Sequence, residues 1–200
     1  MVSNNNYKLF LKCILSNCNY SLINNLSQSN GKSNYILLDS KLIYFVSLHF
    51  RFSSLFYSTQ LIDIFSYEIL NSSFNKSFPL NKSNQLITVY NFNLLNTQDK
   101  FFIFIKNLSL LNNTNTTFFK KVNLTSSVTE LFFSANWLER ECSELHGASF
   151  LGKKDLRNLM LQYGDSSVPF QKSFPSIGLK EMYYNPIKDT IIQNPVTLQI

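Results

Sequence analysis

The hydrophobic pattern between residues 35 and 105 is one of short apolar runs separated by polar turns. Aromatic and β-branched residues dominate these runs, which have the length of strands. Five of them predict strands, at residues 35–38, 42–46, 60–65, 86–92 and 101–105. Residues 48–57, with unevenly spaced apolar positions, are expected to form a crossing helix, and the polar stretch 96–100 predicts a hairpin. The fold class predicted is α+β, a small mixed or antiparallel sheet with helices on one face.

The chain divides into three regions of different composition. Residues 1–34 are rich in Asn and Ser around a short apolar patch, and they are expected to be an N-terminal extension with at most one helix. Residues 35–165 are expected to form the α+β domain, with a polar linker at 71–84. Residues 166–200 hold most of the prolines, so no continuous helix fits there and an extended C-terminal tail is predicted.

Residue usage is strongly skewed and changes along the chain. The sequence has 25 Asn and 19 Phe but 2 Ala and 5 Gly. Asn is a poor helix former, so this skew indicates an AT-rich gene, with a mitochondrial genome as the obvious source and a plastid or AT-rich microbe as alternatives. From about residue 126 onward, acidic residues, Ala, Gly and Pro become frequent. Residues that resist the codon bias mark the last third as the informative part.

Charge and cysteine usage exclude several classes of protein. The net charge is +6, but three Arg and scattered Lys disfavour a nucleic-acid-binding role. Cys13, Cys18 and Cys142 form neither a disulfide framework nor a CxxC pair, which suggests a reducing compartment and no metal or cluster held by this chain. No apolar run approaches the ~18 residues of a membrane span, so no transmembrane helix is expected. The N-terminus makes a poor presequence.

A helix is bracketed at both ends between Ser134 and Gly147, an N-cap and a C-terminal cap residue. The apolar positions Ala135, Leu138, Cys142 and Leu145 recur on one stripe of this helix. Arg140 and Glu144 are spaced to pair with each other. The acidic cluster around Arg140 is expected to form an ion-pair network that holds the helix against a neighbouring chain.

The segment from Asn136 to Tyr184 resembles the 30-kilodalton subunit of respiratory complex I, the NADH dehydrogenase subunit 9 or NuoC family. Weaker likeness begins near residue 35. The residues that carry the resemblance, and that are candidates for a family signature and partner interface, are Trp137, Glu139, Arg140, Glu141, Glu144, Gly147, Phe150, Asp155, Arg157, Tyr163, Gly164, Pro169, Lys172, Phe174 and Pro175.

The resemblance implies a structural and assembly subunit of the matrix arm of NADH:ubiquinone oxidoreductase, in the quinone-reducing module on the inner membrane. Its partners would be the large hydrogenase-like subunit and adjacent iron–sulfur subunits, over which residues 166–200 would run. FMN, iron–sulfur clusters and ubiquinone would be carried by those partners, while this chain would have no cofactor and no catalytic residue. Plastid NAD(P)H dehydrogenase subunit J and a mitochondrial ribosomal or RNA-binding protein are the alternatives.

Departures from the family pattern agree with an architectural role. They are His146, Lys153, Lys154, Val168, Gln171 and Ser173. Proton transfer through the family's His or Asp side chains would be lost by these changes, whereas a scaffold tolerates them. The spacing of Glu144 and His146 disfavours a metal site, and Cys142 on the apolar stripe is expected to be an inert buried thiol. Trp137 is expected to take part in the interface.

Overall fold

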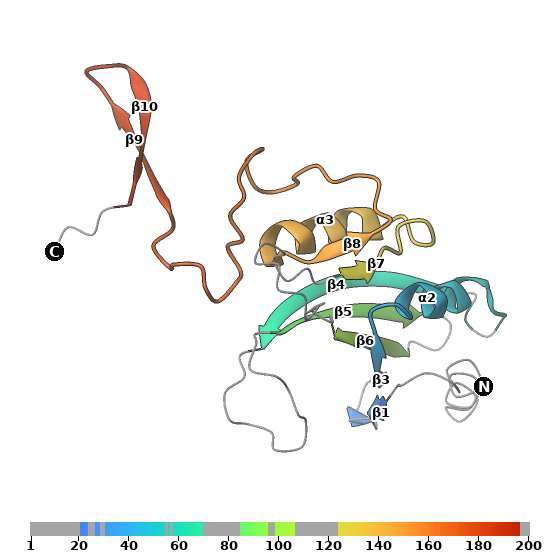
Figure 1. Ribbon diagram of the computed structural model, residues 1–200. Coiled ribbons are helices and arrows are strands. Elements are labelled where there is room, and N and C mark those ends of the chain that lie inside the picture. The colour runs from blue at the N-terminus through green and yellow to red at the C-terminus, as the bar shows by residue number, and fades with distance from the viewer. Residues whose placement is uncertain are drawn as a thin grey trace, which may run out of the picture.

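The computed structural model describes residues 21–23, 27–28, 31–54, 56, 58–69, 85–95, 99–106 and 124–196 (Figure 1). The predicted linker at 71–84 and the apolar patch at 9–15 lie outside these residues. The elements are β1 (Ser21–Ile23), β2 (Ser27–Gln28), β3 (Gly31–Asp39), α2 (Ile43–Phe52), β4 (Thr59–Ile69), β5 (Gln85–Leu94), β6 (Lys100–Lys106), β7 (Leu124–Ser126), α3 (Ala135–His146), β8 (Ser149–Leu151), β9 (Lys180–Asn185) and β10 (Thr190–Pro195).

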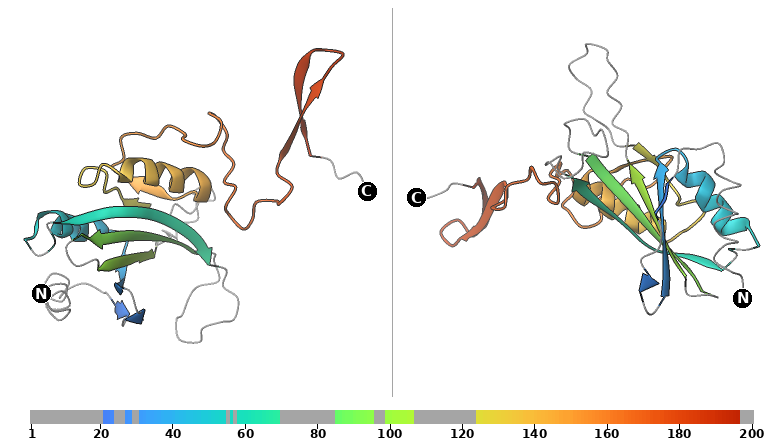
Figure 2. Two further views of the ribbon diagram at one scale, coloured as in Figure 1. Left: turned by 180° about the vertical axis from the view of Figure 1, so that it is seen from behind. Right: turned by 90° about the horizontal axis from the view of Figure 1, so that it is seen from below.

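The main sheet has the strand order β1-β3-β6-β5-β4, with β2 added to β3. The β3–β6 pair is parallel and the other pairs are antiparallel, so the sheet is mixed. Helix α3 packs over β4, and α2 lies on the same side of the sheet (Figures 1 and 2). An extended C-terminal arm leaves the domain and ends in the β9–β10 hairpin. The predicted α+β fold class, with its mixed sheet and C-terminal tail, is confirmed.

The core lies between one face of the sheet and the two helices. Period-two alternation along the strands places every second side chain on this face. Ile36, Ile103 and Tyr90 are aligned across β3, β6 and β5 in this way, and all three are fully buried. Phe50 of α2 packs against Phe92, and its ring makes an edge contact with a centroid distance of 5.2 Å. These contacts join the sheet and the helices into a single core.

Three local predictions differ from the structure. The predicted strand at 42–46 is instead the N-cap Leu42 and the first turn of helix α2, although its aromatic and β-branched side chains favour a strand. Ile43, Val46, Ser47 and Phe50 recur at helical spacing, and all four face the core, so burial of this face overrides local propensity. The helix predicted at 48–57 therefore begins earlier and ends at Phe52. The segment 1–34, expected to hold at most one helix, contains β1, β2 and the start of β3.

Strand β4 is an edge of the sheet, and α3 covers part of that edge. The Ile64 carbonyl oxygen accepts a hydrogen bond from Sγ of Cys142 at 3.2 Å. The Leu61 carbonyl oxygen lies 3.5 Å from Oγ of Ser134. Backbone groups on an uncovered edge strand promote pairing with other chains, and the side chains of Cys142 in α3 and of Ser134 at its N-cap occupy two of them.

Candidate functional site

Helix α3 carries the residues that the sequence singles out, and both of its ends lie where the local pattern places them. Ser134 occupies the N-cap position, but its side chain makes no capping hydrogen bond. Gly147 adopts the left-handed conformation with φ of 72°, and its N–H donates to the Ser143 carbonyl. Ala135, Cys142 and Leu145 are buried as the apolar stripe predicts.

Glu139 lies on the same buried face of α3 and is completely removed from solvent. Its Oε1 accepts a hydrogen bond from the Val128 backbone N–H at 2.8 Å, and its Oε2 accepts one from the Ser127 hydroxyl at 2.8 Å. Nζ of Lys153 lies 3.3 Å from Oε2 and also donates to the Asn136 carbonyl. Burial raises the pKa of Glu139 and lowers that of Lys153, and the contact between them opposes both shifts.

Arg140, the next residue of α3, binds the segment that follows β8. Its Nε donates to the Arg157 carbonyl at 2.7 Å, and its Nη2 donates to the Asn158 carbonyl at 3.0 Å. Nη1 of Arg140 lies 3.6 Å from Oδ2 of Asp155, and Nη2 of Arg157 lies 2.9 Å from the same oxygen. Hydrogen bonds from Arg157 hold the pKa of Asp155 well below its usual range. The planar guanidinium thus organises a turn of irregular backbone.

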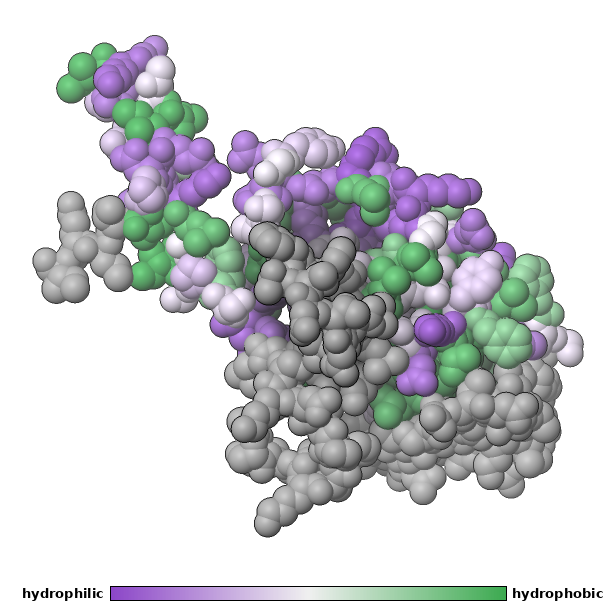
Figure 3. Space-filling model, viewed as in Figure 1, coloured by the Kyte–Doolittle hydropathy of each residue, from purple (hydrophilic) through white to green (hydrophobic). Residues whose placement is uncertain are grey.

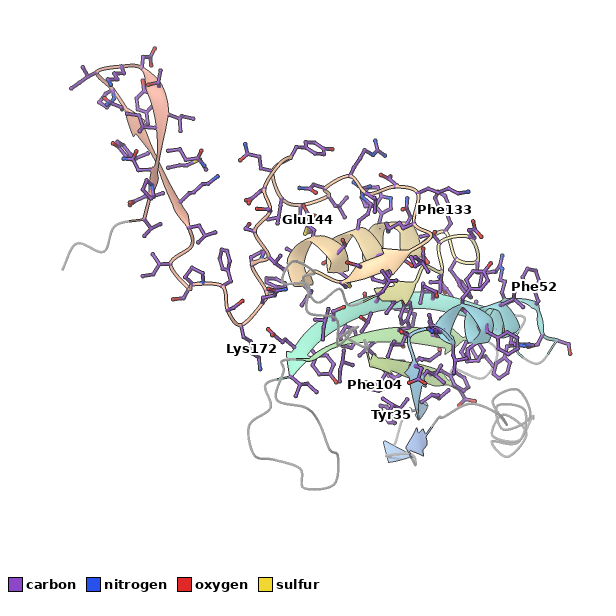
Figure 4. The ribbon with its side chains drawn as sticks, in the orientation of Figure 1. Tyr35, Phe52, Phe104, Phe133, Glu144 and Lys172 are labelled. Carbon is purple, nitrogen blue, oxygen red and sulfur yellow. The ribbon has the colours of Figure 1, made fainter. Side chains whose placement is uncertain are left out.

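Glu144 holds the next part of the same segment. Its two carboxylate oxygens accept hydrogen bonds from the backbone N–H groups of Leu159, Met160 and Leu161, at distances of 3.0, 2.9 and 2.5 Å. Figure 4 shows the Glu144 side chain directed from α3 toward this segment. Partial burial raises the pKa of Glu144, and the three amides lower it by more, so the net shift is downward. Glu144 bonds these amides instead of forming the predicted ion pair with Arg140.

Further contacts fasten the segment where it passes the end of α3. The Phe170 N–H donates to the Leu145 carbonyl at 3.0 Å, and the Gln171 side chain donates to the His146 carbonyl at 3.3 Å. The Lys172 N–H then donates to the Glu68 carboxylate at the end of β4, at 2.9 Å (Figure 4). Residues 152–179, all of which the structure describes, contain no helix or strand, so these bonds fix their course.

The predicted ion-pair network therefore exists, but it joins α3 to its own chain. Arg140 and Glu144 line an open hollow of about 190 Å³ together with Lys153, Arg157 and Asp165. Sequence reasoning missed Ser127 and the Val128 amide, and it treated Lys153 as a departure without seeing that it pairs with Glu139. No local pattern connects these positions to the helix, since they lie in separate segments.

The arrangement offers no nucleophile–base pair at Cys142 and His146. Sγ of Cys142 bonds the Ile64 carbonyl, and burial raises the pKa of this thiol to about 12. The His146 ring instead makes an edge contact with Phe170, with a centroid distance of 5.2 Å. Within the described residues there is no cluster of three or more metal-ligating side chains. Glu139, Arg140 and Glu144 of α3 thus bind backbone N–H and C=O groups of other segments of the same chain.

The other predicted site residues fall into three groups. Phe150 is buried against the core, and Gly147 lies at the end of α3. Trp137 is 60% exposed and Tyr163 is 74% exposed. Glu141 is partly buried on α3, and the remaining predicted residues lie along the segment that leaves the domain, namely Gly164, Pro169, Lys172, Phe174 and Pro175.

Comparisons with known proteins agree with this arrangement. The family model for the respiratory-chain NADH dehydrogenase, 30 Kd subunit, matches residues 54–180. An NADH-quinone oxidoreductase subunit of Dechloromonas aromatica is 43% identical over 74 residues, which are 37% of this chain and 37% of that protein. NADH-ubiquinone oxidoreductase subunit 9 of Paramecium primaurelia is 53% identical over 64 residues, or 32% and 31% of the two chains. The matched stretch thus spans less than two fifths of the length of these relatives.

Solved structures share the fold. A trypsin-resistant fragment of Nqo5 superposes with a TM-score of 0.54 at 19% identity, covering 75% of this chain and 98% of that one. A chain of the membrane-bound sulfane sulfur reductase, an archaeal respiratory membrane complex, gives 0.51 at 13% identity, covering 82% and 80%. Because the family match takes in more than half of the residues, including all of α3, this chain belongs to the family of the 30 Kd subunit of the respiratory-chain NADH dehydrogenase.

Proposed function

We propose that this chain is a structural and assembly subunit of the matrix arm of mitochondrial NADH:ubiquinone oxidoreductase, within its quinone-reducing module. It supports electron transfer from NADH to ubiquinone, coupled to proton translocation, without a catalytic residue or cofactor of its own. FMN, iron–sulfur clusters and ubiquinone belong to its partners. The observation that carries this proposal is the use of Glu139, Arg140 and Glu144 to fix irregular backbone in their own chain.

The exposed apolar side chains of the last third supply the partner surface. A lone domain seldom leaves so many large apolar groups in water, and such groups typically mark protein interfaces. Those from residue 156 onward are Leu156, Met160, Tyr163, Phe170, Ile177, Leu179, Met182, Tyr183, Tyr184, Ile187 and Ile191. In Figure 3 apolar and polar groups alternate along the arm. We assign residues 166–200 to contact with the large hydrogenase-like subunit and adjacent iron–sulfur subunits.

Two exposed aromatic side chains at the start of α3 add to this surface. Phe133 lies just before the helix and Trp137 lies in its first turn, and they are 85% and 60% exposed. Aromatic side chains of this kind are frequent energetic anchors of interfaces. Trp137 therefore keeps its expected role at the interface, while Glu139, which is buried in its own chain, acts by holding the surface in shape.

The location on the matrix side of the mitochondrial inner membrane rests on two observations. Codon bias toward Asn and Phe indicates an AT-rich gene, and the Paramecium subunit 9 is similar over the signature segment. In the part of the chain that the structure describes, no helix has the length and apolar character needed to span a membrane. Attachment to the membrane through the rest of the complex follows from the proposed role.

Native-gel electrophoresis of membranes from the source organism tests the proposal. The chain should migrate with iron–sulfur subunits and NADH dehydrogenase activity. Co-purification with plastid subunits would favour the subunit J alternative, and RNase-sensitive sedimentation with ribosomes would support the RNA-binding alternative.

The Arg140→Ala variant separates an architectural role from a chemical one. Loss of its bonds to the Arg157 and Asn158 carbonyls should lower the amount of assembled complex and the NADH:quinone activity in the same proportion. Lys154→Ala, at a side chain that is 88% exposed, is the matched control and should assemble fully. Full assembly of the Arg140→Ala variant with lost turnover would instead assign direct chemistry to Arg140.

A further inference from the structure

Among the described residues, the β9–β10 hairpin is a two-stranded sheet without a third strand or a packed layer of its own. Its strands pair antiparallel through six residue pairs, from Asn185–Thr190 to Lys180–Pro195. It lies apart from the domain in all the views of Figures 1 and 2, and most of its side chains are exposed. An isolated two-stranded hairpin is marginally stable in water, and a third strand or a packed layer is what usually stabilises one.

The register of the hairpin determines which backbone groups remain available. Antiparallel pairs alternate between positions that exchange hydrogen bonds and positions whose N–H and C=O point outward. The Val196 N–H donates to the Leu179 carbonyl, which identifies this pair as hydrogen-bonded. By alternation, Glu181–Asn194 and Tyr183–Ile192 are bonded pairs as well. The N–H and C=O groups of Lys180, Met182 and Tyr184 therefore form the outer edge of β9.

The two edges of the hairpin are not equivalent. The outward positions of β10 are Ile191, Gln193 and Pro195. Proline has no N–H, so this row lacks a donor at its last position, and prolines are typical of strands that stay at the edge of a sheet. The edge of β9 keeps all three donors and all three acceptors. It is thus the edge that can accept another strand.

The side chains around this edge favour a protein strand. Met182 and Tyr184 lie on one face of the hairpin together with Ile191, which is the cross-strand neighbour of Tyr184. All three side chains are exposed. The hairpin has two basic residues, Lys180 and Lys188, and two acidic residues, Glu181 and Asp189, so its charge is balanced and gives no attraction to phosphate-bearing partners.

We infer that the outer edge of β9 pairs with an exposed strand edge of a partner subunit, so that the hairpin extends a sheet across the subunit boundary. The inference rests on the proposed function and adds the mode of contact. Backbone hydrogen bonds from Met182 and Tyr184 would supply attachment, and the apolar face of Met182, Tyr184 and Ile191 would select a strand with apolar side chains on the matching face.

Proline substitutions test which edge is used. Met182→Pro removes an outward donor of β9 without breaking a bond inside the hairpin, and Gln193→Pro does the same on β10. Met182→Ala controls for the lost side chain. We expect incorporation into the assembled complex to fall about tenfold in Met182→Pro relative to Met182→Ala. Gln193→Pro should incorporate like the unaltered chain. Equal effects of the two proline variants would overturn the inference.

Hydrogen exchange of the assembled complex gives an independent readout. The Met182 and Tyr184 amides should be protected in the complex and should exchange quickly in the isolated chain, while the Gln193 amide exchanges quickly in both. Fast exchange at Met182 and Tyr184 in a complex that contains the chain would overturn the inference and leave the proposed function standing. Failure of the chain to join any such complex would count against the proposed function itself. An isolated chain that forms dimers with protected β9 amides would show that a second copy is the occupant.

Discussion

Glu139 and Lys153 form an ion pair that is closed off from solvent, with Nζ and Oε2 3.3 Å apart and side chains that are 0% and 1% exposed. Each charge is hydrogen-bonded further, Glu139 to Ser127 and Val128, and Lys153 to the Asn136 carbonyl. Desolvation of two charges is costly, and the remaining lone pairs and protons must be satisfied for such a pair to persist. The pair therefore joins α3, the turn after β7 and the segment after β8 at one point.

Lys153→Met should be strongly destabilising. It leaves the Glu139 carboxylate buried without its counter-charge, a change that typically costs about 3 kcal/mol. Urea denaturation of the purified chain measures the loss. The double variant Glu139→Gln/Lys153→Met, which removes both charges, should recover much of the stability. Lys154→Met is the matched control, because its pair with Glu130 is largely exposed and should have little effect. Equal losses in both single variants would contradict a special role for the buried pair.

Acid should loosen the segment held by Glu144. Because the pKa of this carboxyl is lower in the folded protein than in the unfolded chain, its stabilisation is complete above the ordinary value of 4.5 and is lost as the pH falls through the lowered value. Protection of the Leu159, Met160 and Leu161 amides against exchange should therefore decrease below pH 4.5. Protection factors at neutral and acidic pH provide the measurement.

Glu144→Gln should reproduce this loosening at neutral pH. Charge-assisted hydrogen bonds are stronger than neutral ones, so protection of the three amides should fall about tenfold. Glu141→Gln is the matched control, since Glu141 lies on the same helix and forms no side-chain hydrogen bond among the described residues. Unchanged protection in the Glu144→Gln variant would mean that the segment is held by other contacts.

Sequence reasoning succeeded where the determinants are local. Ser134 and Gly147 mark the ends of α3, and short runs of aromatic and β-branched residues mark β4, β5 and β6. It failed at residues 42–46, because only the tertiary core decides that Ile43 and Val46 share a buried helical face. The partners of Glu139 lie 11 to 14 residues away in other elements, so no local pattern could identify them.

Burial of Glu139 itself was open to prediction. It lies one turn after Ala135 and three residues before Cys142, both on the apolar stripe of α3, so the helical period places its carboxylate toward the core. A buried carboxylate requires donors, which indicates an internal partner before a neighbouring chain. The prediction that the whole acidic cluster contacts another chain did not take into account that the helical period directs Glu139 toward the core.

Gly147→Ala should destabilise the chain more than Gly164→Ala. Both glycines have positive φ, 72° and 84°, so both substitutions introduce a backbone penalty of about 1 kcal/mol. A Cβ at Gly147 would also lie 2.9 Å from Nε2 of Gln171, whereas nothing lies within 4 Å of a Cβ at Gly164. The Gln171 side chain would have to move and lose its bond to the His146 carbonyl.

Thermal unfolding of the two glycine variants measures this difference. Each kcal/mol corresponds to roughly 3 °C for a chain of this length. Gly164→Ala should therefore lower Tm by about 3 °C, and Gly147→Ala by several degrees more. Equal shifts would show that Gln171 adjusts without cost and that the Gly147 position is required for backbone geometry alone.

Cys142 should resist thiol reagents in the folded chain. Burial raises its pKa to about 12, and its Sγ bonds the Ile64 carbonyl on the edge of β4, so at pH 8 it is a neutral thiol without access to solvent. In a Cys13→Ser/Cys18→Ser background, Cys142 is the remaining thiol, and its labelling by a chromogenic disulfide reagent should require unfolding by urea. Since the labelling rate then reports opening between α3 and β4, Lys153→Met should accelerate it and Lys154→Met should not. Rapid labelling of the folded chain at pH 8 would contradict the assignment of Cys142 as an inert thiol that covers the edge of the sheet.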